Sequence, residues 1–286
     1  MTAGTLFDRR RTPLTVWFQA CWEFASAKDG ISAQALARNL EMGSYATAWA
    51  MLHRLRSVLV RPGRELLNGI VEVDETYIGG VEPGLKGGRQ KGKKSLVVVA
   101  VEVGDERGMG RARMQAVPDA TGATLRKFIT ETVEPGARII TDGLPSYARI
   151  SEDGYTHDPR NQKAAKAAGE DLDSILPGVH RVAALVKRWL LSTHEGAVSP
   201  EHLPAYLDEF VFRFNRRRSR SRGLLFYRLL QLAVDHDPVR YTDLVANPAS
   251  KEEAPQPPGT AGHPPSLDRP RAARPWRNTT HSGPVN

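Results

Sequence analysis

The segment IVEVDETYI, Ile70 to Ile78, decides the fold, because its β-branched residues are typical of a strand in a sheet. A second β-branched run, SLVVVAVEV from Ser95 to Val103, is apolar on both faces and reads as a buried strand. Arg111 to Val117 and Ala137 to Thr141 predict a third and a fourth strand, with a helix from Thr121 to Glu134 between them. The segment at Ile70 is therefore the first strand of a sheet.

A short strand and two amphipathic helices follow. Gly154 to His157 predicts an edge strand, and Val179 to Thr193 and Leu203 to Asn215 keep the apolar spacing of helices that cover a core. Three strands, a helix, a fourth strand and then helices indicate an α/β fold, a mixed sheet flanked by helices.

The residues before the sheet are helical. Ser32 is placed as the N-cap of a short helix, Ala33 to Leu40, and Met42-Gly43-Ser44 separates it from a longer helix, Tyr45 to Val60. This is the outline of a helix-turn-helix, and a plain helical packing unit is the alternative. On the longer helix we expect Ala48, Met51, Leu52 and Leu55 to face inward and Thr47, His53, Arg54 and Arg56 to face outward.

Composition limits the partners. The 286 residues carry 40 Lys and Arg against 32 Asp and Glu, a net charge of +8 that suits a nucleic acid. The single cysteine, Cys21, excludes an intramolecular disulfide framework and a four-cysteine zinc site. No apolar run approaches the roughly 20 residues that span a bilayer. The last 40 residues hold nine of the 20 prolines and are expected to be disordered. We therefore expect a soluble, cytoplasmic protein without a membrane partner.

Two carboxylates are the first candidates for chemistry. Asp74 lies in mid-strand, where a buried carboxylate needs a charged partner or a cation. Asp142, followed by Gly143, ends the fourth strand, and ligands gather at the carboxyl ends of strands in open α/β sheets. If the two strands are neighbours, the aspartates converge on a site for Mg²⁺ or Mn²⁺. The alternatives are a solvated edge residue for Asp74 and a turn for Asp142.

Basic residues supply the second set of candidates. His180 and Lys187 share one face of a predicted helix, two turns apart, although such residues are often plain surface groups. Two further basic clusters flank the sheet and could neutralise DNA phosphates. The Gly-rich loop contributes Lys86, Arg89, Lys91, Lys93 and Lys94, and the later run contributes Arg213, Arg216, Arg217, Arg218, Arg220 and Arg222. Arg54, Arg56, Lys187 and Arg188 complete the predicted DNA contacts.

Three blocks of sequence resemble a known family, the ISXO-like group of bacterial insertion-sequence transposases. They are VEVDETYIGG (Val71 to Gly80), TDGLPSY (Thr141 to Tyr147) and VHRVAALVKRWLLSTHEGAVSPEHLPAYLDEFVFRFNRR (Val179 to Arg217). The blocks occur in the family's order, and the resemblance covers about Gly4 to Asp243.

The resemblance implies a DDE-type transposase with an RNase-H-like catalytic domain at residues 69–246. A helix-turn-helix-like DNA-binding region at 1–68 precedes it, and a disordered tail at 247–286 follows it. Asp74 and Asp142 match the family's first two catalytic aspartates, which would hold two Mg²⁺ or Mn²⁺ ions. The expected partner is double-stranded DNA, at the element's terminal repeats and at the target. The protein would act as a homo-oligomer on DNA, in the cytoplasm and associated with the nucleoid.

The third catalytic position departs from the wider pattern. Related transposases place a Glu seven residues before a Lys, and alignment on Lys187 puts His180 in that position. The ISXO-like group tolerates His there. Glu209 on the next helix is the reserve carboxylate, with an ion pair to Arg213 one turn on as its structural alternative. We expect His180 to be the third member.

The N-terminus also departs from the family, whose members usually carry a cysteine-based zinc ribbon there. With Cys21 alone, we expect no zinc in this chain, and either a start codon assigned too late or a truncated element. Two other functions compete with that of an active transposase. One is a catalytically defunct DNA-binding protein derived from a transposase, and the other is an RNase-H-fold nuclease without strand transfer.

Overall fold

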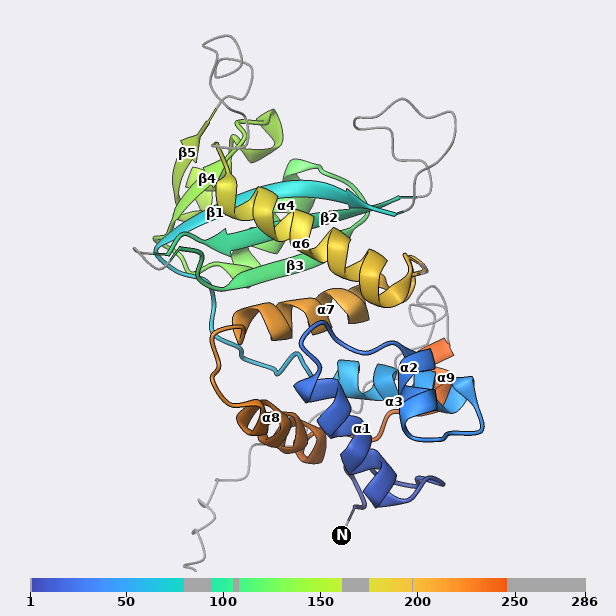
Figure 1. Ribbon diagram of the computed structural model, residues 1–286. Coiled ribbons are helices and arrows are strands. Elements are labelled where there is room, and N and C mark those ends of the chain that lie inside the picture. The colour runs from blue at the N-terminus through green and yellow to red at the C-terminus, as the bar shows by residue number, and fades with distance from the viewer. Residues whose placement is uncertain (1, 80–93, 105–107, 161–174, 197, 246–286) are drawn as a thin grey trace, which may run out of the picture. The chain divides into compact units, whose positions relative to one another are not determined.

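The β-branched segment that contains Asp74 forms the central strand of a five-stranded sheet (Figure 1). The strands are β1 (Ile70–Ile78), β2 (Ser95–Glu102), β3 (Ala112–Val117), β4 (Arg138–Thr141) and β5 (Thr156–Pro159). Their order across the sheet is β3-β2-β1-β4-β5. β2 is antiparallel to both β1 and β3, whereas β1, β4 and β5 are mutually parallel. The predicted α/β fold, a mixed sheet flanked by helices, is confirmed.

This computed structural model describes residues 2–79, 94–104, 108–160, 175–196 and 198–245. All of them belong to one compact unit, Met1–Pro248. The predicted loop cations Lys86, Arg89, Lys91 and Lys93, and the predicted tail at 247–286, lie outside the described residues. Within the described ranges, no helix is long and apolar enough to cross a membrane.

Helices cover both faces of the sheet, because β2 is apolar on both sides. Val98 points into a core with Phe128, whereas Val97 points into the opposite core with Val182. In Figure 1, α6 and α7 lie over the second of these faces. The helices are α1 (Leu14–Ser26), α2 (Ala33–Asn39), α3 (Tyr45–Ser57), α4 (Gly122–Thr132), α6 (Pro177–His194), α7 (Leu203–Asn215), α8 (Arg222–Asp235) and α9 (Tyr241–Val245). Two short 3-10 turns, η1 (Pro145–Tyr147) and η2 (Ile150–Asp153), follow β4.

The N-terminal helices confirm part of the prediction. The Ser32 side chain accepts a hydrogen bond from Ala35 N at 3.1 Å, as expected of an N-cap. On α3, the residues expected to face inward are buried: Ala48, Met51, Leu52 and Leu55.

The outward orientation expected for His53 and Arg56 is wrong, since both are buried. The reason is that α7 packs on the second side of α3. The His53 ring centroid lies 5.4 Å from that of Tyr206, and the Arg56 guanidinium lies 4.1 Å from the same ring. Periodicity within one helix cannot show that a second element covers its polar side.

A buried ion cluster joins three helices. Glu209 on α7 is 0% exposed and accepts hydrogen bonds from Arg56 Nε at 2.7 Å and from Arg213 Nε at 2.8 Å. Arg213 also donates to the carbonyl oxygens of Phe24 and Ala27 on and beside α1. One carboxylate thus holds α1, α3 and α7 together.

We predict that Glu209→Gln lowers the free energy of unfolding by about 3–5 kcal/mol, because Arg56 would keep a buried charge without a counter-charge. Urea unfolding measures the loss. The matched control is Glu131→Gln on α4, whose partner Lys127 lies 4.0 Å away at the surface, and it should change stability by less than about 1 kcal/mol.

We also predict that the stability difference between wild type and Glu209→Gln depends on pH. Burial acts to raise the pKa of Glu209, but the charges of Arg56 and Arg213 outweigh it, so the pKa lies below its ordinary value of 4.5. The stability that the ionised carboxylate contributes is complete above pH 4.5 and is lost as pH falls through the lowered pKa. The gap between wild type and Glu209→Gln should narrow in acid, and a constant gap would contradict this assignment.

Candidate active site

Asp74 and Asp142 occupy equivalent positions after paired residues on neighbouring parallel strands. The β1–β4 pairing runs to Glu72↔Ile140, and each aspartate lies two residues beyond that pair. Residues two apart point to the same face of a sheet. Ile140 belongs to the core under α6, and Glu72 reaches the start of α6. Strand alternation therefore directs Asp74 toward the α6 face, whereas Asp142 directly follows the end of β4. β1 is a central strand, although its pairing with β4 ends at Glu72, so Asp74 lies on a central strand beside β2.

The Asp74 carboxylate faces a histidine of α6. Its Oδ1 accepts a hydrogen bond from Glu75 N at 2.8 Å, and its Oδ2 lies 3.5 Å from His180 Nε2. The Asp74 side chain is 14% exposed and that of His180 is 28% exposed. Both groups are thus shielded yet open to solvent, as a site that meets substrate requires.

Glu72 fixes the start of α6. Its carboxylate is 4% exposed and accepts the Val179 N–H at 2.9 Å. Burial raises its pKa, while the N–H groups of Val179 and Gly178 act to lower it. A Cβ at Gly178 would lie 2.9 Å from Glu72 Oε2, so a larger residue there would displace the carboxylate from the helix start. The carboxylate caps the positive end of the helix and places His180, the next residue after Val179, beside Asp74.

Lys187 extends the same face of α6. Partial burial lowers its pKa, the like charge of Lys94 lowers it further, and Asp74 acts in the opposite direction. Lys187 therefore lies within electrostatic range of both Asp74 and Lys94. Of the predicted loop cations, Lys94 is the one within the described residues, and it lies directly before β2.

Asp142 also forms a turn. Its Oδ1 accepts a hydrogen bond from Leu144 N at 3.0 Å, and Gly143 has φ +78°, a conformation that favours glycine. Thr141 Oγ1 supports this turn by accepting from Gly143 N at 3.3 Å, and it lies 2.9 Å from His157 Nε2. Asp142 therefore both follows the end of the fourth strand and forms a turn.

Tyr147 is a buried tyrosine whose hydroxyl is affected by the negative charges at this end of the sheet. The sequence analysis did not single it out. Its hydroxyl donates to Glu75 Oε1 at 2.5 Å. Burial raises its pKa, and the negative charges of Glu75, Asp74 and Asp142 raise it further. Three carboxylates thus act on one buried hydroxyl. The available signal was its place at the end of the TDGLPSY block.

Glu209 and several predicted DNA contacts have other partners. Glu209 is enclosed by Arg56 and Arg213, so we assign these three residues a structural role. Arg54 Nε donates to the Val239 carbonyl at 2.8 Å. Arg217 and the neighbouring Arg218 donate to the Met109 carbonyl.

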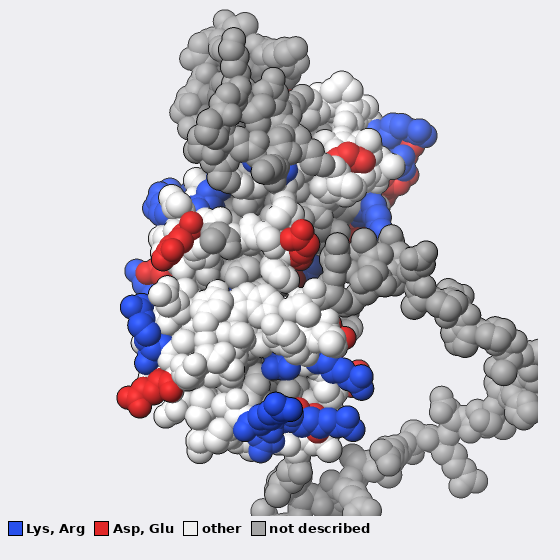
Figure 2. Space-filling view, turned by 90° about the vertical axis from the view of Figure 1, so that its right-hand side faces the viewer, with Lys and Arg blue, Asp and Glu red and all other residues white. Residues whose placement is uncertain are grey.

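Exposed positive charge remains on several elements. Three exposed arginines are Arg188 on α6, Arg220 shortly before α8, and Arg222 at the start of α8. Figure 2 shows one face of the molecule, on which Lys and Arg side chains form separate groups around a broad uncharged area. On this face the positive charge is divided among separate surfaces.

The donor set suits a hard divalent cation. Mg²⁺ keeps several waters and is bound through one or two carboxylates together with substrate phosphates. Asp74 on β1 and Asp142 directly after the neighbouring strand β4 supply two such carboxylates. Among the described residues, no group of three or more His, Cys, Asp and Glu is arranged to hold a metal ion. The residues therefore fit an open site that substrate would complete.

Comparison with known proteins identifies the family. The family described as ISXO2-like transposase domain matches residues 66–215, more than half of the chain, from just before β1 to the end of α7. The chain therefore belongs to this transposase family. A comparison with curated proteins finds no significant match. Among solved structures it is similar to the Mos1 mariner paired end complex with Mn, at 14% identity over 76% of this chain and 77% of that chain. The TM-score of 0.22 is too low to support any argument.

We predict that Glu72→Ala frays the first turn of α6, because the Val179 N–H loses its buried acceptor at a cost of about 1–3 kcal/mol. Hydrogen exchange at the Val179 and His180 amides should become faster. Glu72→Gln, which keeps an acceptor of the same shape, is the matched control and should change these rates less. Unchanged exchange in Glu72→Ala would show that other contacts hold the helix.

Proposed function

We propose that the chain is the catalytic protein of a DNA transposase, which carries out metal-dependent strand cleavage and strand transfer at the ends of an insertion sequence. The observation that carries this proposal is the position of Asp74 on β1 and of Asp142 directly after β4, with His180 Nε2 3.5 Å from Asp74 Oδ2. Membership of the transposase family supports the same chemistry.

Asp74 and Asp142 would hold the divalent ions, two Mg²⁺ or Mn²⁺. When bound, such ions lower the pKa of a water and neutralise charge on the phosphate. In cleavage, a water oxygen bonds to phosphorus as the phosphorus–O3′ bond breaks. In transfer, the released 3′-hydroxyl attacks a target phosphodiester, and that phosphodiester's own O3′ leaves. Neither step needs a covalent enzyme intermediate.

His180 and Lys187 would serve these steps from α6. His180 is held beside Asp74 and would orient the attacking water or contact the scissile phosphate. Lys187 would neutralise phosphate charge, and its ammonium already lies in the field of Asp74. We propose His180 as the third member of the site because Glu209 is engaged by Arg56 and Arg213.

Double-stranded DNA, as element ends and target, is the proposed partner. We propose that residues 1–68 form the helix-turn-helix DNA-binding region and residues 69–246 the catalytic domain. Lys187, Arg188, Arg216, Arg217 and Arg218 remain proposed DNA contacts among the described residues, together with Lys94. The protein would work as a homo-oligomer on DNA, in the cytoplasm and at the nucleoid.

We predict that Asp74→Asn and Asp142→Asn each reduce Mg²⁺-dependent strand transfer by about a thousandfold or more, since metal-held charge stabilisation is worth several kcal/mol. Oligonucleotides that bear the element's inverted repeats serve as substrate. Asp153→Asn is the matched control. Asp153 forms an ion pair with Arg126 on α4, at 2.6 Å, and is not part of the candidate site, so this variant should leave activity unchanged.

The outcomes of this assay separate the competing functions. Salt-sensitive DNA binding without cleavage under any divalent ion would favour a defunct DNA-binding protein. Cleavage without strand transfer would favour a nuclease. His180→Ala should lose strand transfer while staying folded, and full activity in that variant would remove His180 from the site.

A further inference from the structure

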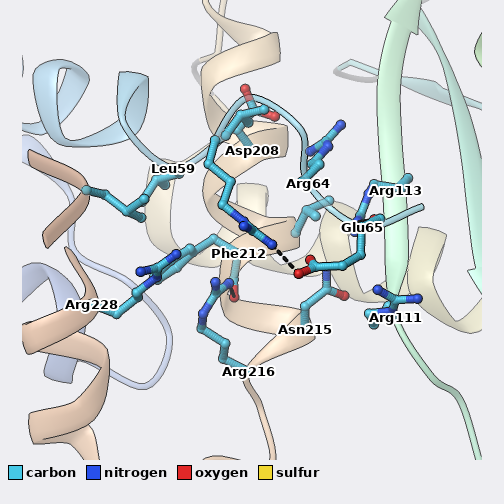
Figure 3. Close-up of a pocket in the computed structure, with 14 residues that line it drawn as sticks. Leu59, Arg64, Glu65, Arg111, Arg113, Asp208, Phe212, Asn215, Arg216 and Arg228 are labelled. Carbon is cyan, nitrogen blue, oxygen red and sulfur yellow. Dashed lines mark hydrogen bonds and ion pairs between the residues drawn. The ribbon is translucent and has the colours of Figure 1, made fainter. Parts of the chain in front are cut away.

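A second concave site shares no residue with the candidate active site. It lies where the segment between α3 and β1 meets β3, α7 and α8, and it has a volume of about 270 Å³ (Figure 3). Its charged lining residues are Arg61, Arg64, Glu65, Arg111, Arg113, Asp208, Arg216 and Arg228. Six arginines against two carboxylates make this cavity strongly positive.

Two of the arginines already have carboxylate partners. Arg61 pairs with Glu65, and Arg111 pairs with Glu102 at 2.6 Å. The other four have no carboxylate within ion-pair distance among the residues that the structure describes. They come from four different elements: Arg64 before β1, Arg113 on β3, Arg216 at the end of α7 and Arg228 on α8.

Arg113 and Arg216 are held by carbonyl oxygens alone. Arg113 is 5% exposed and donates to the carbonyls of Ala112 and Glu65 at 3.0 and 2.6 Å. Arg216 donates to the Phe212 carbonyl at 3.3 Å and lies over the Phe212 ring. A shielded guanidinium without a counter-charge is costly, and an anion in the cavity would offset that cost.

The charges in the cavity repel one another. Burial, together with the positive charges of Arg64 and Arg111, lowers the pKa of Arg113 to about 10. Burial also lowers the pKa of Arg216, as do Arg228 and Arg61. Asp208 offsets only part of this repulsion, because it is one carboxylate among several arginines. Burial raises its pKa to about 6, although Arg64 acts to lower it, so the carboxylate is still mostly ionised at pH 7.

We propose that this cavity binds a phosphate group through Arg64, Arg113, Arg216 and Arg228. Guanidinium groups present planar donor pairs that match phosphate oxygens. In Figure 3, Arg216 and Arg228 lie on one side of the cavity and Arg64 and Arg113 on the other, with the ion pair of Arg61 and Glu65 between them. The phosphate comes either from the backbone of duplex DNA or from a free phosphate. The DNA source rests on the proposed function, whereas the phosphate site itself does not.

The test compares two double variants of the full chain. Arg64→Gln with Arg228→Gln removes two partly exposed guanidiniums and spares the buried Arg113, so the fold should survive. Lys127→Gln with Arg149→Gln is the matched control, since it removes the same charge from side chains that are 73% and 72% exposed.

The first measurement is the affinity for a mixed-sequence duplex oligonucleotide across a series of KCl concentrations. The slope of log K against log salt should become shallower by about 0.9 in the arginine variant, because the cavity holds one phosphate and each phosphate that the protein neutralises adds about 0.9 to the slope. The control variant should keep the wild-type slope.

The second measurement is thermal unfolding with and without inorganic phosphate at constant ionic strength. Phosphate should raise the Tm of the wild type and of the control, but not that of the arginine variant. A changed DNA slope supports the DNA source, and lost phosphate stabilisation with an unchanged slope supports a free phosphate. If neither the slope nor the stabilisation differs from wild type, the proposal is overturned.

Asp208→Asn provides a test of opposite sign. It removes a negative charge from the cavity and should tighten phosphate binding, and weaker binding would contradict the proposal. Asp74→Asn keeps the cavity intact and should keep the stabilisation of the Tm by inorganic phosphate. A failure of the catalytic proposal and a failure of this one would therefore be seen in different assays.

Discussion

The contact between the Glu72 carboxylate and the first N–H groups of α6 is the constraint on which the candidate site depends. A carboxylate at 4% exposure is costly, and the unpaired N–H groups of a helix start are among the few partners that offset the cost. This contact joins the central strand to the helix that carries His180 and Lys187. Because Asp74 lies two residues after Glu72 on the same face, holding α6 at Glu72 also holds His180 at Asp74.

The buried arginines of this chain fall into two groups, those that pair with a buried carboxylate and those that donate only to carbonyl oxygens among the described residues. Arg56 and Arg213 turn inward and neutralise Glu209, which lies at 0% exposure between three helices. Arg113 is also shielded, but carbonyl oxygens rather than carboxylates receive its N–H groups. Part of the net charge of +8 is therefore internal. Composition predicts a polyanionic partner, but it cannot distinguish a guanidinium that holds helices together from one that faces a ligand.

Much of the fold could be predicted, because strands and amphipathic helices leave local patterns. The predicted strand at Ile70 to Ile78 matches β1, and the predicted helix at Leu203 to Asn215 matches α7. Helix α8 is not among the predicted helices, although its buried residues Leu225 and Leu229 have helical spacing. Of the candidate site, the aspartates could be named from the sequence, but Glu72 and Tyr147 could not. Their roles arise from contacts over 107 and 72 residues of sequence.

The sequence by itself determined the α/β fold, its strands and membership of a transposase family, and it named the two candidate aspartates. These follow from local periodicity and from motifs within short segments. Only the tertiary structure decided which charged residues are internal. In the folded chain, His53 and Arg56 face inward and Glu209 is fully buried. Arginines from four elements line one cavity. The physical reason is that burial depends on what packs against a helix or strand from elsewhere in the chain, and that information is not contained in the spacing of its own residues.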